Sequence, residues 1–230
     1  MRKSSSDTLH TKLSMKKIAI VTKNSFSEKQ SDQIKTETID FNPASSAVLV
    51  VDMLKDFFTD GGAMVLDGGE VLYQPHRELL AGARAAGMPV FWLNQDLPPD
   101  DSLFETRAVH CLTGSWGAEI VDEISVEETD VVIPKRRYSG FFQTTLDLNL
   151  RERSIDTVIV TGVVTNICVR STVHDAFFLS YKVLVPEDLV MATSTQAQEV
   201  TLYDIETHYG CVTKLSDLMT VLNNQQSVGS

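Results

Sequence analysis

Residues 157–170 of the chain read TVIVTGVVTNICVR and contain the pattern that decides the fold. Residues 157–161 are rich in β-branched apolar side chains, which is typical of a buried strand, and Gly162 breaks the run. Cys168 then stands where a helix would begin, and the unpaired N–H groups and partial positive charge of a helix N-terminus favour a thiolate and can hold a developing oxyanion. The stretch therefore predicts a strand, a sharp turn and a helix, with Cys168 as the nucleophile of a hydrolase.

Similar short runs recur from Phe41 onward, with helical patterns between them. The other predicted strands are residues 47–51, 89–93, 131–133, 183–185 and, with a weaker pattern, 211–213. Nearly continuous apolar strands are typical of a parallel sheet that helices cover on both faces. The alternation predicts an α/β fold of three α/β/α layers, with a six-stranded, mainly parallel, doubly wound sheet of Rossmann type.

Apolar spacing and terminating residues predict the helices between these strands. Leu79, Leu80 and Ala83 recur at helical spacing, and Gly87 supplies the helix end before the second strand. Ser194 is the predicted N-cap of a later helix, which ends at residue 210, a glycine.

The composition limits the class of protein and of partner. At 230 residues, with 43% hydrophobic and 22% charged residues, the chain has the make-up of one ordinary globular domain. The formal net charge of -11 repels phosphate backbones and anionic membrane surfaces, and no apolar run approaches the ~20 residues of a spanning helix. We therefore expect neither nucleic acid nor a membrane as a partner.

Cysteine use indicates the compartment. Cys111, Cys168 and Cys211 are widely spaced and odd in number, which fits a reducing compartment better than a disulfide framework. We therefore expect a cytoplasmic protein.

The first forty residues differ from the rest because they are polar, basic and rich in serine and lysine. An organelle transit peptide has a similar make-up, but acidic residues interrupt this one and Arg2 is its only arginine. We expect residues 1–40 to form an N-terminal arm that is partly ordered or mediates oligomerisation. Residues 41–223 form the predicted hydrolase domain, and residues 224–230 form a C-terminal tail.

Three reactive side chains fall at the carboxyl ends of predicted strands. Asp52 follows residues 47–51, Lys135 follows residues 131–133, and Cys168 follows the run that opens this section. In open α/β sheets the ligand crevice lies beyond these strand ends, near the point where the strand order reverses. Each residue alone has an ordinary structural explanation, but together they predict one catalytic crevice.

Three motifs resemble those of the isochorismatase-like cysteine hydrolases. They are VVDMLKDF at residues 50–57, IPK at 133–135 with YSGF at 138–141, and TGVVTNICV at 161–169. The similarity covers about residues 41–222, with the motifs in the family's order. It implies a hydrolase that acts on carbon–nitrogen bonds of linear amides other than peptide bonds, without a cofactor and as a homo-oligomer, a dimer or tetramer.

The resemblance also implies a role for each catalytic residue. Asp52 takes the thiol proton of Cys168 and later gives it to the leaving nitrogen, while Lys135 holds Asp52 and favours the charged forms. The thiolate attacks an amide or ureido carbonyl, and the backbone N–H groups of Val164 and Cys168 receive the oxyanion. The family places a cis peptide bond just before the first of these groups, here Val163–Val164. Water then hydrolyses the thioester.

Within the family the chain most resembles the ureidoacrylate amidohydrolases. The similar runs are PKRRYSGFF at residues 134–142, GSW at 114–116, HDAFFL at 174–179 and DIET at 204–207. Enzymes that act on biuret, carbamoyl amino acids or maleamate share much of this framework and remain alternatives. A vinyl-ether hydrolase, which needs no thiol, and a catalytically silent binding or scaffold subunit are further alternatives.

The resemblance raises the question of a metal. In the nicotinamidase branch an Asp-x-His pair after the second strand and a further histidine before a cysteine hold a metal ion. This chain has Asp96 and the pair His110-Cys111 at those places, but Pro98 replaces the histidine of the Asp-x-His pair. Two ligands make a poor catalytic site, so we predict no bound metal and disfavour nicotinamide as substrate.

Substrate contacts are predicted from residue type and position. Arg136 and Arg137 follow the lysine of the site and suit a substrate carboxylate, although they also suit a solvated surface. Gln95, at the end of the second strand, is a predicted partner of an amide or ureido group. The aromatic residues predicted to line the pocket, each of which also suits ordinary core packing, are Phe57, Trp116, Tyr138 and Phe141.

Overall fold

The computed structural model describes residues 41–226. The expectations for the arm at residues 1–40 and for the end of the tail lie outside the described residues. Within them, no helix is long and apolar enough to cross a membrane.

The described residues form one sheet. Its strands are β1 (Ser46–Val51), β2 (Val90–Gln95), β3 (Val131–Lys135), β4 (Thr157–Val163), β5 (Lys182–Pro186), β6 (Val190–Met191) and β7 (Cys211–Thr213). Their order is β3-β2-β1-β4-β5-β7, with β6 also paired to β4, and these pairings are all parallel. The predicted parallel sheet is confirmed, but the prediction of six strands is one too few, because β6 has only two residues and shows no periodicity.

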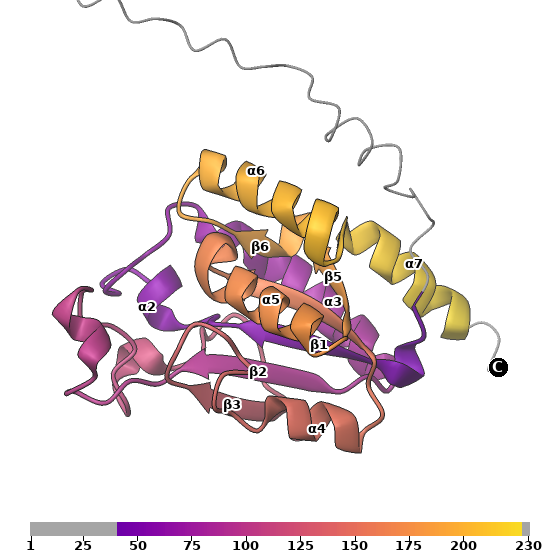
Figure 1. The fold of residues 1–230 in the computed structure, drawn as a ribbon, viewed down its shortest axis with the longest axis horizontal. Helices are drawn as coiled ribbons and strands as arrows, with labels where there is room; N and C mark the ends of the chain where they lie inside the picture. The colour runs from indigo at the N-terminus through magenta and orange to yellow at the C-terminus, as the bar shows by residue number, and fades with distance from the viewer. Residues whose placement is uncertain (1–40, 227–230) are drawn as a thin grey trace, which may run out of the picture. The chain divides into compact units, whose positions relative to one another are not determined.

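Helices cover both faces of this sheet (Figure 1). They are α2 (Lys55–Phe58), α3 (Tyr73–Ala85), α4 (Leu146–Glu152), α5 (Arg170–Phe178), α6 (Thr195–Asp204) and α7 (Leu215–Gln226). On one face, Leu79 of α3 and Leu218 of α7 share a core cluster with Val50 of β1. On the other face, Leu49 of β1 shares a second cluster with Val173 of α5. The predicted three-layer α/β/α arrangement is therefore confirmed.

The two central strands explain the continuous apolar runs in the sequence. Every residue of β1 and of β4 is buried, because each strand has neighbours on both sides and helices above and below. The few polar side chains in these strands need hydrogen-bond partners within the protein. The hydroxyl of Thr161 in β4, for example, donates to the carbonyl of Leu49 at 3.2 Å.

The chain reverses its direction across the sheet beside β1. It passes from β1 to β2 and β3 on one side, and then crosses to β4 and β5 on the other. The carboxyl ends of β1 and β4 therefore flank the switch point at which open α/β sheets form their ligand crevice. Asp52 follows β1, and the turn that carries Cys168 follows β4.

Strand β3 lies at one edge of the sheet and positions Lys135. In its pairing with β2, Pro134 lies opposite Asn94 and Lys135 lies opposite Gln95. Ile133 and Lys135 are buried and Pro134 is exposed, as the alternation of an edge strand requires.

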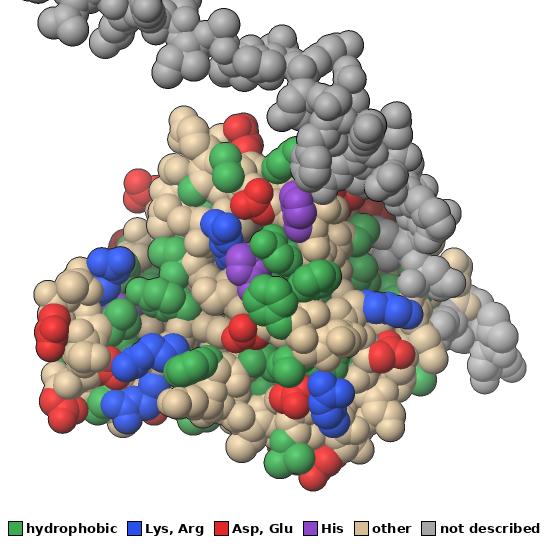
Figure 2. Space-filling model, viewed as in Figure 1, with side chains coloured by type: hydrophobic (Ala, Val, Ile, Leu, Met, Phe, Trp, Pro, Cys, Tyr) green, Lys and Arg blue, Asp and Glu red, His purple; other side chains and the backbone are tan. Residues whose placement is uncertain are grey.

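Hydrophobic side chains gather on the surface over α5 (Figure 2). Phe177 and Phe178 near the end of α5 are 44% and 69% exposed, and Tyr203 of α6 is 56% exposed. Large exposed aromatic side chains in one place are typical of a surface that contacts another protein.

Replacement of Gly162 tests the close approach of β4 to β1. Gly162 has a φ of +97°, and a Cβ there would lie 2.0 Å from the carbonyl oxygen of Val51. We expect Gly162→Ala to lower the free energy of unfolding by about 3 kcal/mol or more, because overpacking adds to the cost of the left-handed backbone. Gly87→Ala is the control, since Gly87 has a φ of +73° but no atom within 4 Å of the new Cβ, and we expect about 1 kcal/mol. Equal losses in urea unfolding would contradict this account.

The buried His76 of α3 predicts sensitivity to acid. Burial lowers the pKa of His76 from 6.5 to about 4, although the hydrogen bond between its Nδ1 and the carbonyl of Leu72 opposes the shift. The unfolded chain therefore binds a proton between pH 6.5 and 4 that the folded chain does not, and the stability falls as the pH falls through this window. At pH 4.5 we expect His76 to account for a loss of about 2 to 3 kcal/mol relative to pH 7.5.

The measurement is urea unfolding of the parent and of His76→Gln at both pH values. The other titrating groups are common to both proteins, so they cancel in the difference between the two pH-dependent losses. A loss of the same size in both proteins would show that His76 is not the cause.

Candidate active site

The end of β1 turns Asp52 out of the sheet and into the crevice. Asp52 has a φ of 51°, in the left-handed region that aspartate tolerates better than most residues. Its N–H still donates to the carbonyl of Leu93 at 3.1 Å, while the N–H of Leu54 donates to the carbonyl of Asp52 at 2.8 Å. The carboxylate is 1% exposed, so its hydrogen-bond partners must come from the protein.

Both oxygens of the Asp52 carboxylate have such a partner. The ammonium of Lys135 donates to Oδ2 at 2.7 Å, and the backbone N–H of Gln95 donates to Oδ1 at 2.7 Å. Lys135 and Gln95 are opposite each other in β3 and β2. The carboxylate therefore fastens the ends of three adjacent strands together.

The electrostatics favour an ion pair between Asp52 and Lys135. Burial lowers the pKa of the Lys135 ammonium, but the Asp52 carboxylate, Cys168 and the hydrogen bond to Asp52 outweigh it and raise that pKa above its usual value. Lys135 is thus a cation within the protein interior. Removal of either partner would leave an uncompensated buried charge, which is strongly destabilising.

Cys168 lies in a π-helical turn, Thr165–Val169, which connects β4 to α5. The carbonyl of Val164 accepts the N–H groups of Ile167 and Val169 at 2.9 and 3.3 Å and so closes this turn. Cys168 itself is only 4% exposed. The predicted strand, turn and helix are present, but the α-helix begins at Arg170 and the cysteine precedes it.

Thr172 of α5 holds the turn that carries the cysteine. Its hydroxyl donates to the carbonyl of Cys168 at 2.8 Å and accepts the backbone N–H of Gly140 at 3.0 Å. Gly140 belongs to the loop that follows Lys135. One hydroxyl thus connects the cysteine turn to the loop after the lysine strand.

The protonation of Cys168 differs from the expectation based on a helix N-terminus. Burial raises the pKa of the Cys168 thiol, Lys135 lowers it, and the charge of Asp52 and a hydrogen bond to it raise it further, so that the pKa is well above its usual value. The resting site therefore favours the thiol over the thiolate. A thiol with a raised pKa needs a nearby base before its sulfur can attack, and the Asp52 carboxylate is close enough to act on the pKa of this thiol.

The peptide bond between Val163 and Val164 is cis, as the family resemblance implies. Val164 follows the last residue of β4 and is 8% exposed. The N–H groups predicted to hold an oxyanion therefore come from the beginning of the π-turn, at Val164, and from Cys168 within it.

The residues predicted to contact substrate lie in different environments. Gln95 is 1% exposed, and Phe57 and Phe141 are 4% and 8% exposed and belong to the two core clusters. Tyr138 is half-buried. Trp116 is 45% exposed, and the ammonium of Lys55 lies 5.9 Å from its ring centroid.

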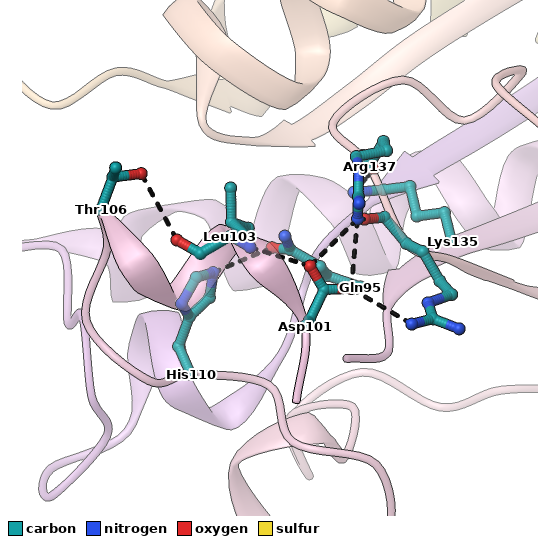
Figure 3. A network of polar contacts seen from close by, with 8 residues as sticks. Gln95, Asp101, Leu103, Thr106, His110, Lys135 and Arg137 are labelled. Atoms are coloured by element: carbon teal, nitrogen blue, oxygen red, sulfur yellow. Dashed lines mark hydrogen bonds and ion pairs between the residues drawn. The ribbon is translucent and has the colours of Figure 1, made fainter. Parts of the chain in front are cut away.

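The two arginines after Lys135 form ion pairs with Asp101 (Figure 3). A nitrogen of Arg136 lies 3.3 Å from the carboxylate and one of Arg137 lies 3.1 Å from it. The hydrogen bond from the N–H of Leu103 and those from the arginines lower the pKa of Asp101, against the effect of burial. Both arginines border a cavity of about 640 Å³ whose lining also includes Asp96 and Gln143.

The residues at the places of the nicotinamidase metal ligands do not fit a metal ion. Pro98 offers no side-chain ligand, and both ring nitrogens of His110 are engaged, Nδ1 with the carbonyl of Ala108 at 2.7 Å and Nε2 with Gln95 at 3.3 Å. Among residues 41–226, no group of three or more histidines, cysteines or carboxylates has an arrangement that could hold a metal. A structural zinc needs four ligands and a catalytic zinc needs three.

Asp56 and Thr172 support the site and were not predicted from the sequence. Asp56 Oδ2 accepts the backbone N–H of Cys111 at 2.6 Å and Oδ1 accepts that of Ala63 at 2.9 Å, so it holds two loops beside the crevice. Thr172 stands four residues after Cys168, where a hydroxyl on a helix can reach a carbonyl, and this spacing is a usable sequence signal. The long-range contacts of Asp56 have no such signal.

Comparison with known proteins identifies the family of the chain. An isochorismatase domain matches residues 46–217. The chain is 34% identical over 216 residues to the ureidoacrylate amidohydrolase RutB of Klebsiella pneumoniae subsp. pneumoniae. The aligned region covers 82% of this chain and 92% of that protein.

Two solved structures share the fold. A cysteine hydrolase from Pseudomonas syringae pv. phaseolicola has a TM-score of 0.76 and 28% identity, over 83% of this chain and 99% of its own. N-carbamoylsarcosine amidase from Thermoplasma acidophilum has a TM-score of 0.67 and 33% identity, over 74% and 96%. The resemblance predicted from three motifs is confirmed, and the chain belongs to the isochorismatase family.

Proposed function

We propose that this protein is a metal-independent cysteine amidohydrolase that cleaves a C–N bond of a ureidoacrylate-type acid through a thioester intermediate. The observation that carries the proposal is the buried Asp52–Lys135 ion pair beside the Cys168 thiol. The similarity to a ureidoacrylate amidohydrolase over 92% of that protein supports the substrate class.

The reaction begins with the transfer of the thiol proton of Cys168 to Asp52. The sulfur then forms a bond to the ureido or amide carbonyl carbon, and the N–H groups of Val164 and Cys168 donate to the oxyanion. As the intermediate collapses, the C–N bond breaks and Asp52 gives its proton to the leaving nitrogen. Lys135 keeps Asp52 in place and stabilises its charge throughout.

Water completes the cycle by hydrolysing the thioester. Asp52 accepts a proton from the attacking water, the C–S bond breaks, and the sulfur recovers a proton. An amide substrate yields an acid and ammonia, and a ureido substrate yields a carbamate together with the ammonia or amine that leaves in the first step. The site thus returns to the thiol form that burial favours.

The surroundings of the site suit a small acidic substrate. Arg136 and Arg137 are the basic residues that border the 640 Å³ cavity, and they suit a carboxylate because guanidinium groups bind carboxylates in a bidentate way. We assign Phe57, Gln95, Trp116, Tyr138 and Phe141 to the walls of the substrate pocket beside Cys168, with Gln95 as a polar contact. None of them is among the residues that line the 640 Å³ cavity. Carbamoyl amino acids are the second candidate substrates, supported by the structural similarity to N-carbamoylsarcosine amidase.

We further propose that the protein acts in the cytoplasm as a homo-oligomer. The exposed aromatic side chains Phe177, Phe178 and Tyr203 support an association surface on α5 and α6. The arm at residues 1–40 is a second candidate element of association.

Substitution of the nucleophile tests the reaction. Release of ammonia is measured with ureidoacrylate, biuret, carbamoyl amino acids, maleamate and nicotinamide, with carbamate allowed to decompose before the measurement. We expect turnover of ureidoacrylate by the parent protein and a loss of at least about 1,000-fold in Cys168→Ala, because no thioester can form.

Cys211→Ala is the matched control, since Cys211 is a free, half-buried cysteine on β7 and should leave the rate unchanged. Turnover that survives Cys168→Ala would disprove the assigned nucleophile. Inactivity of the parent on every compound would favour a binding or scaffold role.

The donor set around Asp96 and His110 predicts independence from metals. We expect dialysis against a chelator to leave kcat/KM for the best substrate within about twofold, because His110 is committed to Ala108 and Gln95 and Pro98 supplies no ligand. Elemental analysis that finds stoichiometric zinc, manganese or iron in active protein, with activity lost on its removal, would contradict the prediction.

A further inference from the structure

Gln95 and His110 form a buried pair beside the proposed site (Figure 3). The Nε2 atom of His110 lies 3.3 Å from the side-chain oxygen Oε1 of Gln95. The other amide atom of this glutamine, Nε2, is buried and has no hydrogen-bond partner among the described residues. A buried amide group that lacks a partner is uncommon in a folded protein and calls for a physical reason.

The second ring nitrogen of His110 fixes the tautomer. Nδ1 lies 2.7 Å from the carbonyl oxygen of Ala108, and a carbonyl oxygen only accepts hydrogen bonds, so Nδ1 carries a proton. A neutral imidazole has a single N–H, and its Nε2 is then an acceptor. That acceptor faces Oε1 of Gln95, which also only accepts.

The ring of His110 is enclosed by other rings and has no counter-ion among the described residues. His110 is 5% exposed, and its ring is packed against the rings of Phe57 and Phe104 at centroid distances of 5.9 and 6.0 Å. No carboxylate of residues 41–226 lies within ion-pairing distance of the imidazole. A buried cation without a counter-ion is costly.

A half-turn of the Gln95 amide about its last side-chain bond removes the mismatch. The NH2 group then donates to Nε2 of His110, and the carbonyl oxygen takes the position of the unpartnered atom. Side-chain amide oxygen and nitrogen are nearly indistinguishable by shape, so the hydrogen-bond network decides between the two orientations.

The position of Gln95 connects this orientation to the reaction. Its backbone N–H donates to Oδ1 of Asp52 at 2.7 Å, and it lies opposite Lys135 in the sheet. The backbone of Gln95 is therefore anchored at the same strand end as the proposed catalytic carboxylate and ammonium. A carbonyl oxygen in that position has no donor within the described part of the protein. An N–H group of a bound substrate can supply one.

We infer that His110 is a positioning residue that holds the Gln95 amide with its carbonyl oxygen toward the substrate, so that Gln95 accepts a hydrogen bond from a substrate N–H. The inference rests on the proposed function and adds which substrates the site selects. These are ureido compounds and primary or secondary amides, which have an N–H beside the reacting carbonyl. A compound without that donor leaves a buried acceptor unpaired and is rejected.

The tautomer of His110 is tested by 15N NMR of histidine side chains in the parent protein at pH 7.5. The chain has five histidines, and the His110 signal is identified by its loss in His110→Gln. We expect a neutral ring with the proton on Nδ1. A doubly protonated ring would overturn the inference, because His110 would then donate to Oε1 and leave the NH2 group of Gln95 toward the substrate.

Gln95→Glu gives an independent spectroscopic outcome. The carboxylate offers only acceptors to Nε2 of His110, so we expect this substitution to convert the ring from the neutral to the doubly protonated form. An imidazole that stays neutral in Gln95→Glu would show that the two side chains are not paired through Nε2 and would overturn the inference.

Two substitutions of His110 test the positioning role in kinetics with ureidoacrylate. A glutamine at position 110 places an amide oxygen near the former Nε2 and keeps an acceptor for the Gln95 NH2 group, whereas a leucine does not. We expect KM to rise about tenfold in His110→Leu and less than threefold in His110→Gln, with kcat within threefold in both, since one hydrogen bond is lost.

An equal rise of KM in the two variants would show that His110 only fills space and would overturn the positioning role. If the parent does not turn over ureidoacrylate, the proposed function fails for that substrate. The NMR result still decides the orientation of the Gln95 amide in that case, and the kinetic comparison is made with the compound that the parent does hydrolyse.

Discussion

The buried ion pair between Asp52 and Lys135 is the interaction on which the site depends. Asp52 is turned out of the central strand in a left-handed conformation, and Lys135 comes from an edge strand two positions away in the sheet. The strand between them contributes the backbone N–H of Gln95 to the same carboxylate. The ion pair therefore forms only when the three strands are paired in this register. A slip of one residue in β3 would turn Lys135 to the other face of the sheet.

Burial disfavours the charged forms of both Lys135 and Cys168, but the charges around the two groups differ. The counter-ion of Lys135 lies within hydrogen-bond distance and raises the pKa of the ammonium, whereas the effect of Lys135 on Cys168 does not outweigh burial and the charge of Asp52, so the pKa of the thiol is raised. A protonated sulfur is a poor target for oxidants, which react with thiolates. The raised pKa of Cys168 therefore favours the protonated, less reactive form of this cysteine.

Much of the fold and the central site could be predicted from the sequence, for identifiable reasons. The strands β1 and β4 are buried on both faces, so their apolar runs are continuous, and the polar residues that follow mark the crevice. Strand β6 was not predicted because a strand of two residues is too short to show an alternating pattern of apolar and polar side chains. The raised pKa of Cys168 differs from what a helix N-terminus favours, because the pKa depends on burial, which local sequence does not show.

The supporting contacts were out of reach of the sequence for a different reason. The carboxylate of Asp56 meets the backbone of Cys111, 55 residues later, and Asp101 meets Arg137 over a separation of 36 residues. Such contacts arise only when loops fold back over the strand ends. Arg136 and Arg137 were predicted as partners of a substrate carboxylate. The structure shows that both also form ion pairs with a carboxylate of the protein, that of Asp101.

Pro134 gives the edge strand β3 a further property. The carbonyl of Lys135 accepts the N–H of Asp96 and so faces the rest of the sheet, which means that the neighbouring residue, Pro134, has its backbone directed outward. An exposed strand edge is a template on which another chain can pair, and a proline there removes one of the N–H donors such pairing would use. The strand that carries Lys135 is thereby less able, one residue before that lysine, to be extended into an intermolecular sheet.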